Sequence, residues 1–193
     1  MRFVETKLKG AWIVELETKD DDRGFFARAF CQREFEEHAI APDVCQANLS
    51  LSSKTGTVRG MHFQYPPAAE NKFIRCISGA LLDVIVDLRP ESQTFLQHTA
   101  VELTASNRRA FVVPPRFAHG FMTLADETEV LYLVSAFYTP AEEGGLRHDD
   151  PLLGIAWPRA VSVISDKDAT WSSLSDQRER IGQKMRTDGQ DAN

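Results

Sequence analysis

Basic residues, cysteines and long apolar runs are all scarce in this sequence, and each shortage excludes a class of protein. The 22 Lys and Arg residues are outnumbered by 28 Asp and Glu, for a net charge of −6, and no segment concentrates basic residues. A nucleic-acid or anionic-membrane partner is therefore not expected. The 3 cysteines, Cys31, Cys45 and Cys76, lie far apart and form no C-x-x-C pair. This spacing indicates neither a disulfide framework nor a zinc knuckle, and favours reduced thiols in a cytoplasmic protein.

No apolar run reaches the roughly 18 residues that a membrane-spanning helix needs. Residues 1–20 carry scattered charges and lack the apolar centre of a signal peptide. With 193 residues, of which 42% are hydrophobic, the chain can build one core of its own. We expect a single domain over residues 1–174 and a polar, partly disordered tail over residues 175–193.

Short segments rich in β-branched and aromatic residues, each closed by turn residues, dominate the rest of the chain. They cover residues 72–88, 98–115 and 128–140. Many short strands with regularly spaced turns predict a mainly β protein, an antiparallel sandwich or barrel, rather than alternating strands and helices.

Two local patterns add detail to this prediction. The turn signal at Ser78-Gly79 predicts a hairpin that would bring Arg75 close to Asp83 as a structural ion pair. Helical pattern is limited to Gln32–Ile40 and to a stretch that begins near Trp171. We therefore expect only a few short helices.

The stretch TVRGMHFQYPP, residues 57–67, places His62 near the end of an expected strand. A metal site in a small β-barrel would need a His-x-His pair, so that both rings point inward, and a carboxylate close by. Gln64 stands where the second histidine would be, and His119 follows much later without a neighbouring carboxylate. The sequence therefore does not favour a metal site.

Proton transfer is the better interpretation of the same stretch. Arg59 and His62 are followed by Lys72 on the next expected strand and by Tyr132 inside an apolar one. A base, a cation and a phenol are the groups needed to remove a proton beside a carbonyl, hold the enolate and return a proton. The alternatives are structural: His62 as a polar strand residue, Arg59 in a surface ion pair, and Lys72 solvated at a strand start.

Six blocks follow one another between about residue 20 and residue 169. They read DDRGFFARAF, QANLSLSSKTGTVRGMHFQYPP, NKFIRCISGALLDVIVDLRPESQTF, FVVPPRFAHGF, EVLYLVSAFYTPAEEGG and DDPLLGIAWP. In this order they resemble the blocks of the dTDP-4-dehydrorhamnose 3,5-epimerase family, over most of the chain.

The resemblance implies a cupin-type double-stranded β-helix, a jelly-roll barrel that works as a homodimer exchanging N-terminal strands, without metal or organic cofactor. It implies an isomerase that inverts C3, C5 or both in a nucleoside-diphosphate-linked 4-keto-6-deoxyhexose, most simply the dTDP-linked sugar of rhamnose biosynthesis. Three alternatives stay open: a mono-epimerase at C3 or C5, an epimerase for another nucleotide-linked keto sugar, and a non-catalytic cupin that binds sugar nucleotides.

Residue by residue, the resemblance also implies roles. His62 matches the general base, Asp168 the carboxylate that pairs with it, Lys72 the enolate-stabilising cation and Tyr132 the acid on the opposite face. Asp166, two residues before Asp168, is the alternative carboxylate. Positions that bind the nucleotide or the sugar fall on Arg23, Phe26, Gln46, Asn48, Arg59, His119 and Tyr138. The two aromatic members of this set would sandwich the nucleotide base.

The chemistry agrees with these roles. A ketone at C4 acidifies the hydrogens at both C3 and C5, so one base on one face of the ring can serve both carbons. Inversion then requires a proton donor on the other face. A carboxylate on the far nitrogen of the imidazole would fix its tautomer and stabilise the imidazolium.

Four positions depart from the family pattern. Arg28 stands where a glutamate is common, Leu49 where a histidine is common, and Thr55 is inserted before a glycine. These changes leave the identity of the nucleotide open. Arg116 replaces the glycine of a turn, so we expect it to adopt an unusual backbone conformation or to displace the loop.

Overall fold

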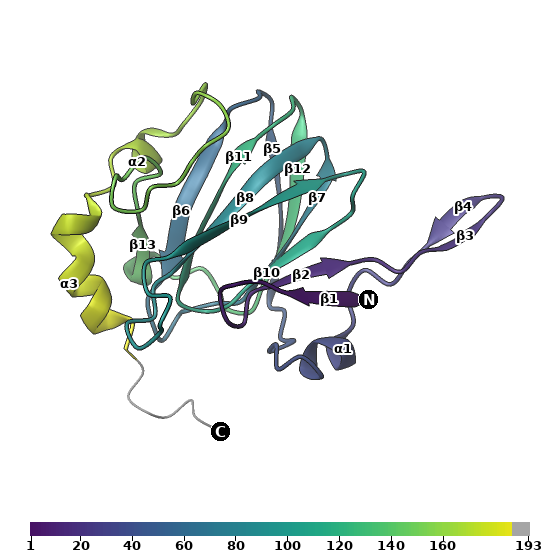
Figure 1. The fold of residues 1–193 in the computed structure, drawn as a ribbon, viewed down its shortest axis with the longest axis horizontal. Coiled ribbons are helices and arrows are strands. Elements are labelled where there is room, and N and C mark those ends of the chain that lie inside the picture. Colours follow the sequence, from purple (N-terminus) through teal and green to yellow (C-terminus); the bar gives the residue numbers. More distant parts are fainter. Residues whose placement is uncertain (187–193) are drawn as a thin grey trace.

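Two antiparallel sheets face each other in the computed structural model, which describes residues 1–186 (Figure 1). The larger sheet contains, in spatial order, β1 (Arg2–Glu5), β2 (Trp12–Glu15), β10 (Ala110–Val113), β7 (Lys72–Ser78), β12 (Thr128–Val134) and β5 (Gln46–Ser52). The smaller sheet contains β13 (Glu143–Gly145), β6 (Val58–Gln64), β11 (Phe117–Thr123), β8 (Ala80–Asp87) and β9 (His98–Thr104). The predicted mainly β, jelly-roll class is confirmed.

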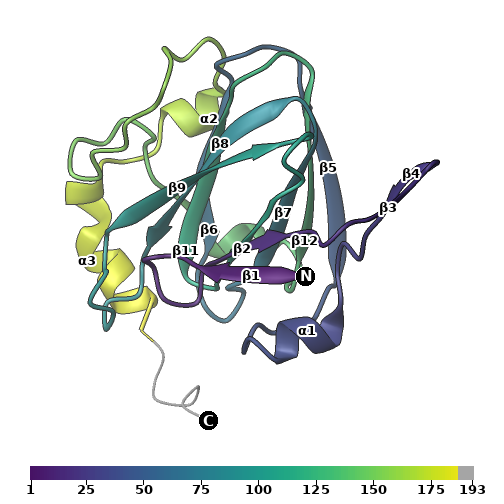
Figure 2. The ribbon, with the colours of Figure 1, turned by 45° about the vertical axis from the view of Figure 1, so that its right-hand side comes forward.

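The remaining elements lie outside this sandwich. They are a two-stranded hairpin of β3 (Lys19–Asp21) and β4 (Gly24–Phe26), the 3-10 helix η1 (Pro140–Glu142) and three α-helices: α1 (Gln32–Glu36), α2 (Asp166–Ala169) and α3 (Leu174–Lys184). Figure 1 shows the hairpin pointing away from the body of the molecule. In Figure 2, α2 and α3 lie on the side of the sandwich opposite the hairpin. None of the helices within residues 1–186 has the length and apolar character that crossing a membrane requires.

Strand periodicity decides which side chains enter the core. Successive strand residues point to opposite faces, so Ile74 and Cys76 of β7 meet Leu81 and Ile85 of β8 between the sheets. Phe111 of β10 completes this contact, and all five side chains are buried. Burying an aliphatic or aromatic side chain of this size stabilises the fold by about 1.5–3 kcal/mol.

The predicted hairpin at Ser78-Gly79 is wrong. The turn joins β7 to β8, which belong to different sheets, so it forms a corner between the two layers. Apolar runs on either side of a glycine suit such a corner as well as a hairpin, because both runs then face one core. The predicted ion pair is wrong for the same reason. Arg75 faces away from Asp83 and donates to the carbonyl oxygens of Arg108 and Ala29 at 2.7 and 3.2 Å.

The two predicted helical stretches are confirmed as α1 and α3. The second of them extends into residues 175–193, which were expected to form a polar, partly disordered tail. Residues 175–184 are helical and dock on the domain, because Leu174, Ile181 and Met185 fall on one helix face and are buried. The polar composition of this segment is that of an amphipathic helix with a narrow apolar stripe. Residues 187–193, the rest of the expected tail, lie outside the described residues.

Candidate active site

Two adjoining cavities open between the sheets, and His62, Lys72 and Tyr132 line both of them. Their volumes are about 390 and 260 Å³. One wall comes from β5, β7 and β12 of the larger sheet, and the other from β6 and β11 of the smaller sheet. His62 therefore approaches the cavities from one wall, and Lys72 and Tyr132 approach from the facing wall.

His62 contacts a buried carboxylate from the far end of the chain. Its Nε2 lies 2.6 Å from Oδ1 of Asp168, and the second oxygen of Asp168 accepts a hydrogen bond from the Gly60 N–H at 3.1 Å. Ser165 caps α2 by accepting from the Asp168 N–H, which fixes the position of the carboxylate. Burial opposes ionisation of Asp168, but the hydrogen bond and charge of His62, together with Gly60, outweigh it and hold the pKa of Asp168 below its ordinary value. Asp168, and not Asp166, is the carboxylate that contacts His62.

Lys72 lies at the start of β7 and is held by a neighbouring carboxylate. Its Nζ is 3.2 Å from Oε1 of Glu70, and the two side chains are only 12% and 11% exposed. Within the described residues this is the one ion pair that either group makes. An ammonium has three N–H donors, so Lys72 can hold Glu70 and still offer donors to an oxygen in the cavity.

Tyr132 is half-buried in β12, where Val130 and Val134 flank it on the same strand face. Burial raises the pKa of Tyr132, the negative charge of Glu70 adds to this effect, and Arg59 opposes it. The phenol therefore stays protonated near neutral pH and can donate a proton.

His119 and Arg59 line the smaller cavity. His119 pairs directly with His62 across β11 and β6, and its Nε2 lies 2.9 Å from Oδ1 of Asp83. Asp83 is fully buried, and desolvation raises its pKa against the influence of His119 and Lys72. Arg59 donates from Nε to Ser52 Oγ at 3.1 Å, which holds its guanidinium beside the cavity. These groups place N–H donors where an anionic ligand could bind.

Gln46, Asn48 and Tyr138 line the larger cavity. The Tyr138 N–H donates to Oε1 of Gln46 at 3.0 Å, and its hydroxyl donates to Oε2 of Glu143 at 3.1 Å. Lys167 forms an ion pair with the other oxygen of Glu143 at 2.5 Å. The exposed aromatic ring of Tyr138 is thus fixed at the mouth of the cavity.

Gln64 has a structural role beside the larger cavity. Its side chain bonds the backbone of Ala68, Phe137 and Thr139, at 2.9, 3.3 and 2.6 Å. These bonds hold the loop that carries Tyr138. Within residues 1–186, no group of three or more His, Cys, Asp or Glu side chains is arranged to hold a metal ion.

Arg23 and Phe26 are the two expected site residues that the structure leaves outside the cavities. Both lie on the β3–β4 hairpin, where the Arg23 side chain is 89% exposed and Phe26 is 71% exposed. Arg23 pairs with Asp21 of the same hairpin. Neither residue lines either of these two cavities in its own chain.

The four departures from the family pattern have separate outcomes. Leu49 is 63% exposed on the outer face of β5, so it points away from the cavity that Gln46 and Asn48 line. Arg28 forms an ion pair with Glu34 at 3.3 Å, away from both cavities. Thr55 lies in the connection between β5 and β6 and lines neither cavity.

Arg116 has the unusual backbone conformation that its place in the turn predicts. Its φ angle is +64°, in the left-handed region where glycine is favoured. This prediction is confirmed.

Glu70, Glu143 and Lys167 are cavity residues that the sequence alone did not reveal. They come from a loop, a short edge strand and a four-residue helix, where hydrophobic periodicity gives no information. The only available signal was proximity in the chain, since Glu70 precedes Lys72 by two positions and Lys167 precedes Asp168.

The arrangement suits proton transfer at carbon. An imidazole with an ionised carboxylate behind it can accept a proton, an ammonium can stabilise an oxyanion, and a protonated phenol on the facing wall can donate.

Comparisons with known proteins give a consistent result. The model of the family described as dTDP-4-dehydrorhamnose 3,5-epimerase matches residues 5–176. The chain is 41% identical over 176 residues to the dTDP-4-dehydrorhamnose 3,5-epimerase of Methanothermobacter thermautotrophicus, covering 90% of this chain and 94% of that protein.

Solved structures show the same likeness. The chain superposes with a TM-score of 0.89 and 35% identity on the dTDP-4-dehydrorhamnose 3,5-epimerase of Elizabethkingia anophelis, covering 92% of this chain and 98% of that one. The TM-score is 0.86, with 33% identity and 93% and 96% coverage, for the dTDP-6-deoxy-D-glucose-3,5-epimerase of Legionella pneumophila, whose structure is a complex with dTDP-4-keto-L-rhamnose.

Proposed function

Because the chain belongs to the dTDP-4-dehydrorhamnose 3,5-epimerase family, we propose that it inverts C3 and C5 of a dTDP-linked 4-keto-6-deoxyhexose. The observation that carries the proposal is the contact between His62 and Asp168 in cavities whose facing wall holds Lys72 and Tyr132. We also propose a cytoplasmic location, which the three free cysteines support.

The proposed reaction begins with His62 as the base. Neutral imidazole removes the proton at C3 or C5, and the electrons of that C–H bond move into an enolate with its charge on the C4 oxygen. The imidazolium is stabilised by Asp168, whose lowered pKa keeps it ionised. The ammonium of Lys72 stabilises the enolate oxygen.

Tyr132 completes the inversion from the facing wall. Its phenol donates a proton to the carbon on the opposite face of the ring, and the C4 ketone re-forms. Solvent then returns a proton to the phenolate and removes one from the imidazolium, so the enzyme is restored without a cofactor. A positioned acid or base is typically worth about 10² to 10⁴ in rate, so Lys72 must supply much of the remaining stabilisation.

Substrate binding divides between the chain and a second copy of it. Arg59 and His119 would bind the diphosphate or sugar within one chain, with Gln46, Asn48 and Tyr138 at the larger cavity. Arg23 and Phe26 are proposed to enter the site of a partner in a homodimer. The exposure of both residues on a hairpin that leaves the body of the molecule supports this division (Figure 1).

Incubation with dTDP-4-keto-6-deoxyglucose in D₂O tests the proposal, with NMR to follow hydrogen exchange and configuration at C3 and C5. We expect deuterium at both carbons together with the doubly inverted sugar. Exchange at a single carbon would identify a mono-epimerase, and exchange at neither would refute the proposal. Added chelator should leave the rate unchanged.

A thermal-shift series with nucleoside diphosphates tests the choice of nucleotide. We expect dTDP to stabilise the protein most strongly. A clear preference for another base would assign the chain to a different nucleotide-linked keto sugar.

A further inference from the structure

A third cavity, of about 560 Å³, lies between the β1–β2 turn, the loop after β8 and the turn before β11. It shares no lining residue with the two cavities of the active site. Four cations line it, Lys7, Lys9, Arg89 and Arg116, against one carboxylate, Glu91. This concentration of positive charge stands out in a protein whose net charge is −6.

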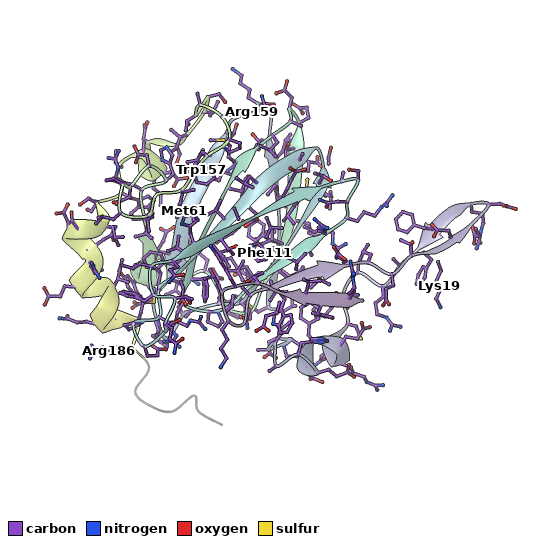
Figure 3. All side chains as sticks on the ribbon, in the orientation of Figure 1. Lys19, Met61, Phe111, Trp157, Arg159 and Arg186 are labelled. Carbon is purple, nitrogen blue, oxygen red and sulfur yellow. The ribbon has the colours of Figure 1, made fainter. Side chains whose placement is uncertain are left out.

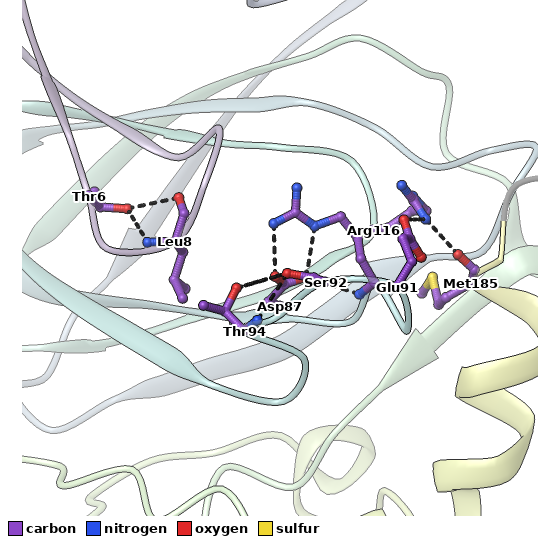
Figure 4. Close-up of polar contacts among 9 residues, drawn as sticks. Thr6, Leu8, Asp87, Glu91, Ser92, Thr94, Arg116 and Met185 are labelled. Atoms are coloured by element: carbon purple, nitrogen blue, oxygen red, sulfur yellow. Dashed lines mark hydrogen bonds and ion pairs between the residues drawn. The ribbon is translucent and has the colours of Figure 1, made fainter. Parts of the chain in front are cut away.

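Arg89 is held rigidly at this cavity. The fully buried carboxylate of Asp87 accepts from its Nε at 2.9 Å and from its Nη2 at 2.8 Å, and also accepts from the hydroxyls of Ser92 and Thr94 (Figure 4). The guanidinium also stacks over Phe117, at 4.6 Å from the ring centroid. Within residues 1–186 no hydrogen bond engages Nη1 of Arg89. A fixed guanidinium with unused N–H donors is suited to an oxyanion.

Arg116 adds a second guanidinium that is only 15% exposed. Its Nη1 donates to the Met185 carbonyl at 2.8 Å and lies 2.7 Å from Oε1 of Glu91 (Figure 4). Glu91 is itself 55% exposed, so an incoming anion can displace it into water. The backbone of Arg116 is in the left-handed region. A non-glycine residue keeps this conformation only where its surroundings compensate for the strain, and such residues are frequent at functional sites.

Lys7 and Lys9 extend the positive charge to the rim. Leu8 between them is fully buried. The Thr6 hydroxyl accepts a hydrogen bond from the Leu8 N–H and donates one to the Leu8 carbonyl, and these bonds anchor the turn (Figure 4). Because Leu8 points into the core, its two exposed neighbours project outward at the cavity. Counting Asp87 and Glu91 against the four cations leaves an excess of two positive charges.

We infer that this cavity binds a small phosphate-bearing anion. The rigid guanidinium of Arg89 and the nearby Arg116 supply directional donors, and the two lysines supply charge at the entrance. The inference rests on residues that the proposed reaction does not use, so it stands or falls independently of that reaction.

Titration with pyrophosphate, at ionic strength held constant with chloride, tests the inference on protein labelled with ¹⁵N-arginine. The Nε–H signals of Arg89 and Arg116 report this cavity, and that of Arg59 reports the active site. We expect the first two signals to shift along one binding curve that is separate from the curve of Arg59.

Arg116→Gly is a decisive variant, because a φ of +64° suits glycine and the backbone of the turn is therefore kept. We expect it to weaken binding at the Arg89 signal by about fivefold or more, and Lys9→Gln to weaken it by about threefold, while the Arg59 curve is unchanged. Arg159→Gln is the matched control, since Figure 3 places Arg159 far from Arg186, the residue that follows Met185. Absence of a shift at Arg89, or equal affinity in Arg116→Gly and the unaltered chain, would overturn the inference.

Discussion

Glu70 illustrates how one residue can influence two of the residues to which we assign catalytic roles. Its carboxylate pairs with Lys72 and adds to the raised pKa of Tyr132. We predict that Glu70→Gln lowers kcat by about tenfold at pH 7, because the Lys72 ammonium loses the contact that positions it. The substitution also removes the negative charge that helps to raise the pKa of Tyr132, so this pKa falls. The phenol then loses its proton at lower pH, and the alkaline limb of the pH–rate profile moves to lower pH.

Steady-state kinetics from pH 6 to 10 measure both effects of the Glu70 substitution. Glu70→Asp should restore the alkaline limb, because it restores the charge. Glu102→Gln, at an exposed position of β9, is the control. An unchanged profile in Glu70→Gln would remove Glu70 from the positioning of Lys72.

Tyr132→Phe separates the two faces of the reaction. His62 can still remove and return a proton on its own side, so deuterium exchange should persist within about tenfold while net inversion falls by about 100-fold. Parallel NMR measurements of exchange and configuration in D₂O give both rates. Tyr65→Phe, which removes a phenol from a buried cluster outside the cavities, should change neither. Equal loss of exchange and inversion in Tyr132→Phe would contradict the assignment.

Asp168 links the site to stability. Its pKa in the folded chain is depressed, so its ionised form stabilises the fold above the ordinary carboxyl pKa of about 4, and this contribution is lost as pH falls through the lower, folded value. We predict that Asp168→Asn costs about 1–3 kcal/mol at pH 7, with a smaller difference below pH ~4. Urea unfolding at several pH values measures the difference in free energy of unfolding between the unaltered chain and Asp168→Asn. A difference that grows as pH falls would contradict the prediction.

At the scale of elements, strand alternation carried most of what could be predicted. Alternation in β5 accounts for why Gln46 and Asn48, which the resemblance implied, face the same cavity, and the apolar runs predicted β7, β8, β9, β10 and β12. The corner at Ser78-Gly79 could not be distinguished from a hairpin, because the choice depends on which sheet receives β8. Glu70, Glu143 and Lys167 could not be found either, since tertiary contacts, and not periodicity, bring them together.

The β3–β4 hairpin carries a prediction of its own. Arg23→Ala and His62→Asn should each abolish most activity when present in every chain. Co-expressed, the two variants should form mixed dimers in which the intact hairpin of one chain meets the intact base of the other, restoring about half of the sites in each mixed dimer. Recovery should be measured on purified mixed dimers. No recovery would mean that Arg23 acts within its own chain or is not used.

At the scale of the whole molecule, the hairpin predicts an obligate pair. We expect light scattering to give about twice the 21.7 kDa of one chain. Replacing residues 19–26 by a short glycine linker should lower activity more than it lowers thermal stability, because both strands of the hairpin are exposed and contribute little to the hydrophobic core. A fully active monomer would contradict this prediction.

The resemblance in sequence predicted the class of fold, and most of the site residues that it implied line the two cavities of the active site. It could not show the third cavity, because Lys7, Arg89 and Arg116 are far apart in the chain and only the folded turns bring them together.

The contact between His62 and Asp168 spans 106 positions of the chain. During synthesis β6, which carries His62, emerges well before α2, which carries its carboxylate partner. Domains generally form as units once their chain is available. A ribosome-bound chain that has not yet released α2 would thus have a pocket in which no carboxylate orients His62, so we expect no action on a reactive keto sugar until α2 has emerged and docked.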